Sequence, residues 1–141
     1  MSDKMIREIL YSSEVVAVVG LSKDSEKASY QVAAYLKSQG YKIIPVNPFV
    51  DEALGEKSYP SLLEIPREIQ KTIDIVDVFR KAEDVPPIIE QTAHLKSQNG
   101  KPSVVWMQLG IVNEKAEEAG KREGLTVIMD KCMMVEHQRL G

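Results

Sequence analysis

Five short apolar runs divide the chain at fairly regular intervals. All are rich in Val and Ile, and the first, second and last show little alternation with polar residues. Unbroken apolar runs of this length are typical of strands that a parallel sheet buries on both faces. The five predicted strands are Val15–Gly20, Lys42–Val46, Ile73–Phe79, Ser103–Leu109 and Leu125–Met129.

The segments between these runs carry helical spacing of apolar residues. Gly40 is placed to end the first of the longer helices, and Asn113 to cap the third. Alternation of strands and helices predicts right-handed βαβ crossovers and an α/β fold with a doubly wound parallel sheet, helices on both faces and one domain over residues 1–141. The predicted helices cover residues 5–11, 28–39, 61–64, 83–98, 113–122 and 131–140.

Composition narrows the classes of partner. The 141 residues include 18 Lys and Arg against 21 Asp and Glu, for a net charge of -3. This mild acidity argues against a nucleic-acid or membrane-surface partner, which would favour a basic stripe. The single cysteine, Cys132, excludes an intramolecular disulfide and fits a reducing, cytoplasmic compartment. No apolar run approaches the ~20 residues of a membrane span. The acidity does not exclude a small anionic ligand, because a pocket can be locally positive.

The turn after the first predicted strand has the chemistry of an anion site. A dinucleotide-binding turn reads G-x-G-x-x-G, and only its first glycine, Gly20, is present here. Gly20 permits a tight turn, Ser22 offers a hydroxyl, and Ser29 is placed to cap the next helix, whose N-terminus favours phosphate. Lys23 and Lys27 add positive charge. The alternative is an ordinary solvated loop between a strand and a helix.

The end of the second predicted strand argues against NAD. An NAD site has an Asp or Glu there for the ribose hydroxyls, but no carboxylate occurs before Asp51. No Arg takes its place, so the usual feature for NADP is missing as well. Pro45 and Pro48 flank Val46 and Asn47 and stiffen the exit. This segment could support a flat adenine ring, or it could simply be a rigid end of the strand.

The third and fourth strand ends supply further candidates. Phe79 and Arg80 would face the ligand crevice, Phe79 for ring contact and Arg80 for charge-assisted bonds to phosphate. Alternatively, Phe79 fills the core and Arg80 is solvated. Gln108 follows a buried run directly, so its amide must be hydrogen-bonded. Trp106 is expected in the core.

Catalytic and metal-binding candidates are few. His94 and His137 fall in helical patterns with no Ser or Cys nucleophile at a recognisable turn. Cys132, Glu136 and His137 lie close along the chain, but their spacing matches no common zinc site. Asp74 and Asp77 are three residues apart on one strand, so they point to opposite faces and make a poor acid–base pair. We predict no catalytic residue and no metal site.

Taken in order, these motifs resemble the stand-alone coenzyme A-binding domain proteins. That family is similar to the CoA-binding domain of succinyl-CoA synthetase α subunits and ADP-forming acyl-CoA synthetases. The resemblance runs from about Val15 to Leu140 and rests on the joint order of its segments. These segments are Val18–Ser22, Ser29–Val32, Tyr35–Leu36, Gly40–Tyr41, Pro45–Pro48, Gly55, Tyr59–Leu62, Asp77–Arg80, Val105–Gly110, Asp130–Met133 and Glu136–Leu140.

This resemblance implies a Rossmann-like fold with CoA across the strand ends. It assigns a phosphate turn, an adenine ledge, contacts from the third strand and a fourth-strand loop that closes the crevice. The synthetases' phosphohistidine belongs to a second domain, so we expect a ligand without a reaction here. The implied CoA-binding residues are Gly20, Ser22, Lys27 and Ser29 for phosphate; Val46, Asn47 and Pro48 for adenine; Phe79 and Arg80; and Gln108 and Gly110.

Two classes of function therefore stand side by side. The first is a module that binds CoA or an acyl-CoA without catalysis of its own. The second is a thiol-redox or acyl-transfer partner that uses Cys132, which lies where a pantetheine arm could reach. Cys132 could equally be a small buried apolar residue. Binding of NAD(P) through an atypical turn is a further alternative.

Overall fold

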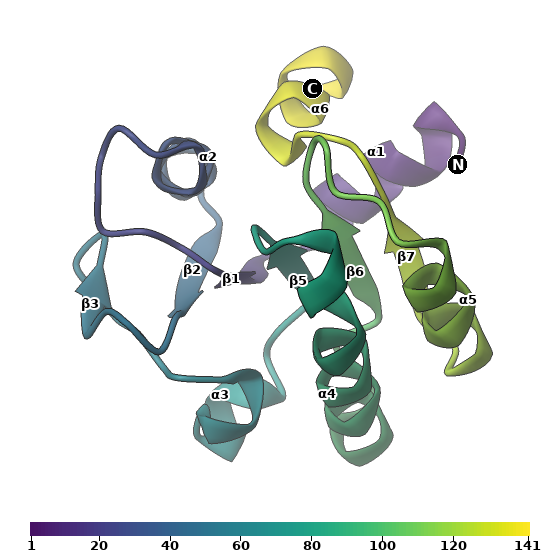
Figure 1. Cartoon of the computed structure of the whole chain (residues 1–141). Coiled ribbons are helices and arrows are strands. Elements are labelled where there is room, and N and C mark those ends of the chain that lie inside the picture. Colours follow the sequence, from purple (N-terminus) through teal and green to yellow (C-terminus); the bar gives the residue numbers. More distant parts are fainter.

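A computed structural model describes all residues, 1–141, and contains a five-stranded parallel sheet (Figure 1). Its strand order is β2-β1-β5-β6-β7, so the chain moves from β1 outward to β2 and then crosses to β5 on the other side. This order confirms the predicted doubly wound, Rossmann-like sheet, and it places the topological switch point between β1 and β5. The strands are β1 (Val15–Val19), β2 (Lys42–Val46), β5 (Ile75–Val78), β6 (Val104–Met107) and β7 (Thr126–Ile128).

Helices cover both faces of the sheet, as predicted. One layer holds α1 (Asp3–Ser12), α2 (Ala28–Ser38) and α6 (Met133–Leu140), at the top of Figure 1. The other layer lies at the bottom of the same view. It consists of the 3-10 turn η1 (Leu62–Glu64), α3 (Arg67–Gln70), the 3-10 turn η2 (Ala82–Asp84), α4 (Val85–Asn99) and α5 (Glu114–Arg122).

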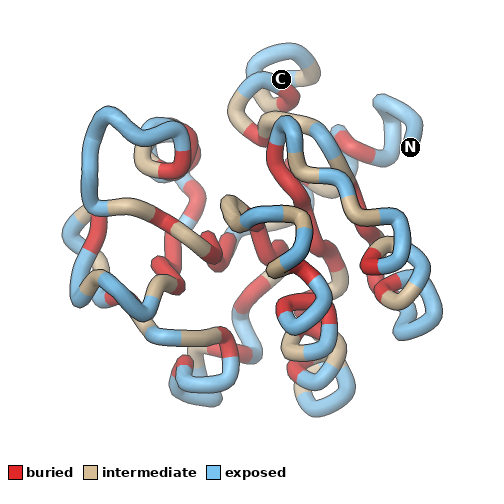
Figure 2. The backbone as a smooth tube through the Cα atoms, viewed as in Figure 1, coloured by how far each residue is buried: buried red, intermediate tan, exposed pale blue.

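The two layers enclose separate halves of the core. Along β1, Val16 and Val18 belong to the cluster under α1, α2 and α6, whereas Ala17 and Val19 belong to the cluster under α4 and α5. Figure 2 shows the resulting band of buried backbone along the strands between exposed helix surfaces. Because successive side chains of a strand point to opposite faces, a sheet buried on both sides needs unbroken apolar runs.

The helix ends follow their local chemistry. Asn113 caps α5, since its Oδ1 accepts a hydrogen bond from the Ala116 N–H at 3.0 Å. Gly40 follows α2 with a φ of 98°, which only glycine adopts readily. No helix of this protein combines the length and the apolar character that crossing a bilayer requires.

Two elements were missed by the sequence pattern, namely the one-turn helix α3 and a hairpin after β2. The short strands β3 (Glu52–Ala53) and β4 (Glu56–Lys57) form an antiparallel hairpin around Leu54 and Gly55, which both have positive φ. After this hairpin, Tyr59 pairs in parallel with Val46. Two-residue strands of mostly polar residues carry no periodicity, so nothing in the pattern distinguished them from a loop.

Candidate ligand-binding site at the carboxyl edge of the sheet

Gly20 lies where the ends of three strands meet. Its N–H donates to the Val46 carbonyl at 2.8 Å, which joins the ends of β1 and β2. Its φ is 90°, and a Cβ placed on it would lie 2.6 Å from the Phe79 carbonyl oxygen and 3.1 Å from Arg80 Cδ. Backbone cannot yield to such a contact as a flexible side chain can. The close approach of β1 and β5 at the switch point therefore requires glycine.

The loop between Gly20 and α2 is held by its own hydroxyl groups. Ser29 Oγ accepts from the Ser22 N–H, and Ser22 Oγ accepts from the Asp24 N–H, both at 3.0 Å. The prediction that Ser29 caps α2 was wrong: the helix begins at Ala28, and Lys27 occupies the N-cap position without a side-chain bond. Ser29 is buried inside the first turn and fastens the loop instead. No side chain caps this turn, and its N–H groups retain their preference for an anion.

Asn47 connects two of the predicted site segments. Its Nδ2 donates to the Leu21 carbonyl at 3.1 Å, and its Oδ1 accepts from the Phe49 N–H at 2.9 Å. Both polar atoms of the side chain are therefore engaged by backbone. Its neighbours Val46 and Pro48, in contrast, line a cavity. Asn47 thus positions the exit of β2 against the Gly20 loop, while the flanking residues supply the surface.

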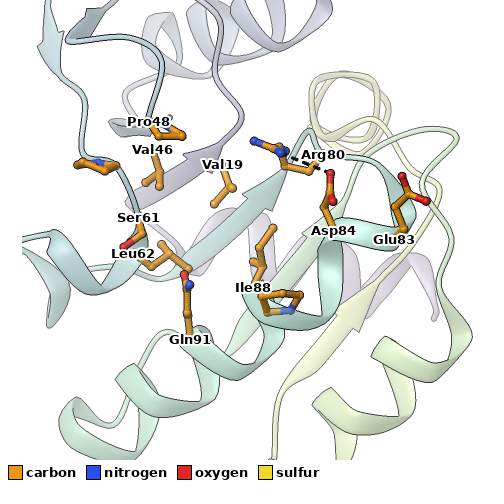
Figure 3. A pocket seen from close by; sticks show the side chains of 12 residues that line it. Val19, Val46, Pro48, Ser61, Leu62, Arg80, Glu83, Asp84, Ile88 and Gln91 are labelled. Carbon is orange, nitrogen blue, oxygen red and sulfur yellow. Dashed lines mark hydrogen bonds and ion pairs between the residues drawn. The ribbon is translucent and has the colours of Figure 1, made fainter.

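The cavity beside Val46 and Pro48, called here the proline-walled cavity, measures about 310 Å³. Figure 3 shows it between the exit of β2, the segment before η1 and the start of α4. Its floor is apolar, and acidic residues and Arg80 stand at its rim. It is lined by Val19, Val46, Leu62 and Ile88, by Pro48, Pro60 and Pro87, and by Ser61, Arg80, Glu83, Asp84 and Gln91.

A second cavity, called here the apolar cavity, measures about 460 Å³ and shares Arg80 with the first. Val32, Phe79 and Cys132 in its wall belong to the α2 and α6 side of the sheet, and only Ile111 packs against the cluster on the α4 side. The core residues of the proline-walled cavity all belong to the α4 side. Arg80 therefore stands between two cavities on opposite faces of the carboxyl edge. The lining residues are Ala28, Val32, Phe79, Arg80, Lys81, Gln108, Leu109, Ile111 and Cys132.

Arg80 has one ionic partner. Its Nη2 lies 3.4 Å from Asp84 Oδ2, and each side chain is exposed by more than a third, at 36% and 40%. A pair this exposed contributes only about 0–1 kcal/mol to stability. The guanidinium can therefore exchange Asp84 for a stronger anionic partner at low cost.

Gln108 is buried and fully bonded, as its position after an apolar run predicted. Only 3% of it is exposed. Its Nε2 donates to Asp77 Oδ1, and its Oε1 accepts from the Met133 N–H at 3.3 Å. Asp77 is completely buried, and burial raises the pKa of its carboxyl to about 7, against the opposing effect of the Gln108 hydrogen bond. Sequence reasoning dismissed Asp77, although an acid inside an apolar strand is itself a signal.

Gly110 shapes the loop that follows β6 without lining either cavity. It has a φ of 85°, and its N–H donates to Asp130 Oδ1 at 2.7 Å. Its neighbours Leu109 and Ile111 line the apolar cavity. The structure thus brings the 108–111 loop to the crevice, with Gly110 as the bend that makes this possible.

Only some of the predicted basic residues lie at the cavities. Lys23 and Lys27 are exposed on the loop before α2 and line neither cavity. Lys81, which sequence reasoning did not single out, lines the apolar cavity beside Arg80. The histidines lie away from both cavities: His94 is exposed on α4, and His137 Nδ1 lies 2.7 Å from the Tyr35 hydroxyl. No cluster of three or more His, Cys, Asp or Glu is placed to hold a metal ion.

Comparison with known proteins adds an independent line of evidence. Residues 14–138 match the sequence model of the family described as "CoA binding domain". The chain is 45% identical over 132 residues to the uncharacterized protein YneT of Bacillus subtilis, covering 94% of this chain and 91% of that protein. It is 33% identical over 120 residues to the ADP-forming acetate–CoA ligase II of Archaeoglobus fulgidus. That match covers 84% of this chain and only 16% of the ligase.

A solved structure agrees over the whole length. "The structure of cell-free ID.343 from Thermus thermophilus" superposes with a TM-score of 0.89 at 36% sequence identity, and the match covers 100% of both chains. The strand order and the layers described above are therefore shared with a protein of the same size.

Proposed function

This chain is a member of the CoA-binding domain family, and we propose that it binds coenzyme A or an acyl-CoA across the carboxyl edge of its sheet, without catalysis of its own. One observation carries this proposal. Two cavities of different chemistry flank Arg80, next to a turn whose glycine cannot be replaced without a backbone clash. CoA has the matching order of parts: a nucleotide, a diphosphate and a long, mostly apolar arm.

The proline-walled cavity suits the adenine end. Three prolines give it rigid walls, and Val46 and Leu62 provide an apolar floor for a flat ring. The absence of a carboxylate at the end of β2 favours this ligand over NAD, whose ribose hydroxyls are normally held by an acid at that point.

The middle of the ligand would lie over the Gly20 turn and Arg80. The first turn of α2 has no side-chain cap, and its dipole favours phosphate by about 0.3–1 kcal/mol, up to ~2 kcal/mol when partly buried. Arg80 would exchange Asp84 for phosphate oxygens, a charge-assisted bond of about 1.5–3 kcal/mol. Lys27 stands at the start of α2 and is placed to add long-range attraction.

The apolar cavity suits the pantetheine arm and a short acyl group. Val32, Phe79 and Ile111 are among its apolar lining residues, and Cys132 lies in its wall. In the apolar cavity, the Cys132 thiol has no base at hydrogen-bond distance, and His137 is bonded to Tyr35. In the proline-walled cavity, Ser61 Oγ donates to Glu64 Oε2 at 3.2 Å, an exposed contact within one turn of the chain and with no third group to orient it. This arrangement supports binding and suggests no reaction.

Two measurements test this proposal. Native mass spectrometry of the purified protein would detect retained CoA, and calorimetry would compare CoA, acetyl-CoA, NAD and NADP. We expect CoA to bind and the two dinucleotides to bind far more weakly. The Arg80→Met variant should lose about 10- to 100-fold in CoA affinity, whereas Arg122→Met, a remote arginine on α5, should bind as the wild type does. No binding of CoA at millimolar concentration would refute the function.

The position of Cys132 favours a second candidate, thiol–disulfide exchange with CoA disulfide. The Cys132 thiolate would attack one sulfur, form a mixed disulfide and release the other CoA as a thiolate, so no further oxidant is needed. Incubation with CoA disulfide should then add one CoA to the intact mass of the wild type and none to Cys132→Ser. Equal masses for the two proteins would remove this candidate.

A further inference from the structure

Asp77 is the one carboxyl group buried in the sheet without a cation. It pairs across the ladder with Val18 on β1 and Trp106 on β6, both members of the core cluster on the α6 side. None of its surface is exposed, and its Oδ2 has no hydrogen-bond partner. A native structure rarely leaves a buried oxygen in this state, so the group calls for a physical explanation.

Its other oxygen is linked to the wall of the apolar cavity. Gln108 Nε2 donates to Asp77 Oδ1, and Gln108 Oε1 accepts from the Met133 N–H, the first residue of α6. The amide has one possible orientation, because the Met133 N–H can only donate and so requires the oxygen end. Gln108 thereby caps α6 from the exit of β6, in place of Cys132, whose side chain makes no cap bond.

The segment that Gln108 holds forms part of the cavity wall. Trp106 Nε1 donates to the Lys131 carbonyl at 2.8 Å, so the chain from 131 to 133 rests on two side chains of β6 and its exit. Cys132 lies between these two supports and lines the cavity together with Gln108. Of the two supports, only Gln108 is bonded to a group that can gain or lose a proton.

We propose that Asp77 is a positioning residue whose proton, acting through Gln108, controls how firmly the start of α6 closes the apolar cavity. With a neutral carboxyl, Asp77 accepts from Gln108 and buries no charge. Once ionised, it leaves a buried negative charge with a single side-chain donor, which favours opening of the Gln108–Met133 contact so that water can reach Oδ2.

No charged group pairs with Asp77, so burial is the main influence on the pKa of its carboxyl. The flanking strands β1 and β6 carry no titratable residue, and α2 presents only Tyr30, Tyr35 and, in its last turn, Lys37. On α6, Glu136 pairs with Arg139 and Lys131, Arg139 also pairs with Asp3 of α1, and His137 is bonded to Tyr35. The cavity wall adds Arg80, Lys81 and Cys132. The raised pKa of Asp77 comes from burial and is opposed only by hydrogen bonds from Gln108 and the Val78 backbone.

The first test uses the ligand-free protein and nuclear magnetic resonance. We expect the Asp77 carboxyl carbon to titrate near neutral pH and the Met133 amide to follow with the same midpoint. In Asp77→Asn, which keeps an acceptor for Gln108 but cannot ionise, this component of the Met133 titration should vanish. Any component that remains in this variant belongs to other groups, which separates them from Asp77.

Two further variants keep this test decisive. Gln108→Leu should leave Asp77 titrating while the Met133 amide no longer follows it. Asp74→Asn, at the opposite edge of the sheet, should change neither titration. A Met133 titration identical in the wild type and Asp77→Asn, or an Asp77 carboxyl that ionises at its ordinary pKa near 4, overturns the proposal.

The consequence for CoA rests on the proposed function. A polyanionic ligand in a closed cavity favours the neutral carboxyl, so CoA binding should take up part of a proton at Asp77. Calorimetry at pH 7.5 in buffers of different ionisation enthalpy should show more proton uptake for the wild type than for Asp77→Asn. The ratio of wild-type to Asp77→Asn dissociation constants should rise about threefold or more between pH 6 and pH 8.5.

This ratio cancels the titration of the ligand's own phosphate, because both proteins bind the same CoA. A ratio that stays flat, together with equal proton uptake, overturns the link to the ligand. Failure of CoA to bind either protein would refute the proposed function, whereas the ligand-free titration decides the role of Asp77 independently.

Discussion

Two aspartates three residues apart show how differently the two edges of the sheet are built. Asp74, at the amino edge, accepts hydrogen bonds from the Glu14 and Val15 N–H groups and from Lys101 Nζ, at 2.8, 3.0 and 2.9 Å. These bonds hold the pKa of Asp74 below its usual value, although burial acts against them. Asp77, toward the carboxyl edge, has one side-chain donor and no cation, and its pKa rises to about 7.

The contrast shows that the two ends of this segment have different roles: the amino end stabilises the sheet, and the carboxyl end borders the candidate ligand site. At the amino edge, a single carboxylate satisfies two backbone N–H groups and a lysine, which closes that end of the sheet. At the carboxyl edge, polar groups remain only partly satisfied: the uncapped turn of α2, the exposed Arg80 pair and the Asp77 oxygen. Incomplete satisfaction lowers stability, and it persists at sites of function. An anionic ligand can complete the first two of these groups, whereas Asp77 is satisfied by its own proton.

The test with the largest expected effect replaces Gly20, the glycine at the carboxyl edge. Gly20→Ala combines a positive φ with a Cβ that would lie 2.6 Å from the Phe79 carbonyl oxygen. We expect a loss of about 4 kcal/mol in the free energy of unfolding, measured by urea denaturation, and loss of CoA binding.

Gly40→Ala is the matched control, because Gly40 has a φ of 98° and a Cβ added to it would meet nothing within 4 Å. It carries the strain without the clash and should cost about 1 kcal/mol while leaving CoA binding unchanged. Similar costs for Gly20→Ala and Gly40→Ala would show that the close approach to Phe79 does not matter.

The second test uses the pH dependence of stability. The folded-state pKa of Asp77, about 7, lies above its value in the unfolded chain. Its contribution is therefore fully present below about pH 4, declines between pH 4 and 7, and is lost above pH 7, in total on the order of 4 kcal/mol. Asp77→Asn should remove this decline and gain most relative to the wild type above pH 7. The free energy of unfolding of both proteins would be measured by urea denaturation across this pH range. Parallel curves for the two proteins would contradict this prediction.

The sequence predicted the scaffold well because the scaffold depends on local patterns. Strands buried on both faces must be apolar throughout, as the Val15–Val19 run is, and caps such as Asn113 act within three residues. Gly20 was also identifiable, since a turn directly after an apolar run has few alternatives to glycine. These features give the five strands, the two helix layers and the edge at which the site lies.

The parts that escaped prediction depend on contacts between distant residues. Asp77 and Gln108 are 31 residues apart and meet only because β5 and β6 are neighbours in the sheet. Lys81 reaches the apolar cavity through the path of the chain after β5. Ser29 looked like a cap because its type and position fit, but its hydroxyl accepts from the Ser22 N–H of the preceding loop instead. Pairing of this kind has no signature in a single sequence.

The third test addresses the amino edge. Asp74→Ala leaves two backbone N–H groups and Lys101 without their acceptor, so we expect a loss of about 1–3 kcal/mol in the free energy of unfolding at pH 7. Because the folded pKa of Asp74 is lowered, this stabilisation is present above the unfolded pKa and is lost as the pH falls below about 4.

Lys101→Met is the control for the ionic part of this contact. Its side chain is 41% exposed, so its removal should cost at most about 1 kcal/mol. Both variants should bind CoA as the wild type does, since the amino edge lies away from both cavities. A change in CoA affinity for Asp74→Ala beyond the loss of folded protein would break the separation of the two edges.

The smallest effect concerns the rim of the proline-walled cavity. Asp84→Asn removes the carboxylate that pairs with Arg80 at 3.4 Å and one negative charge that faces the incoming phosphates. Because the pair is exposed, the free energy of unfolding should change by less than about 1 kcal/mol, whereas CoA affinity should rise about two- to fivefold by calorimetry. Glu117→Gln, which breaks a partly exposed pair with Lys121 one helical turn away on α5, supplies a control without a ligand nearby. If Asp84→Asn lowered CoA affinity instead, Asp84 would act as a support that orients Arg80 and not as a partner that phosphate displaces.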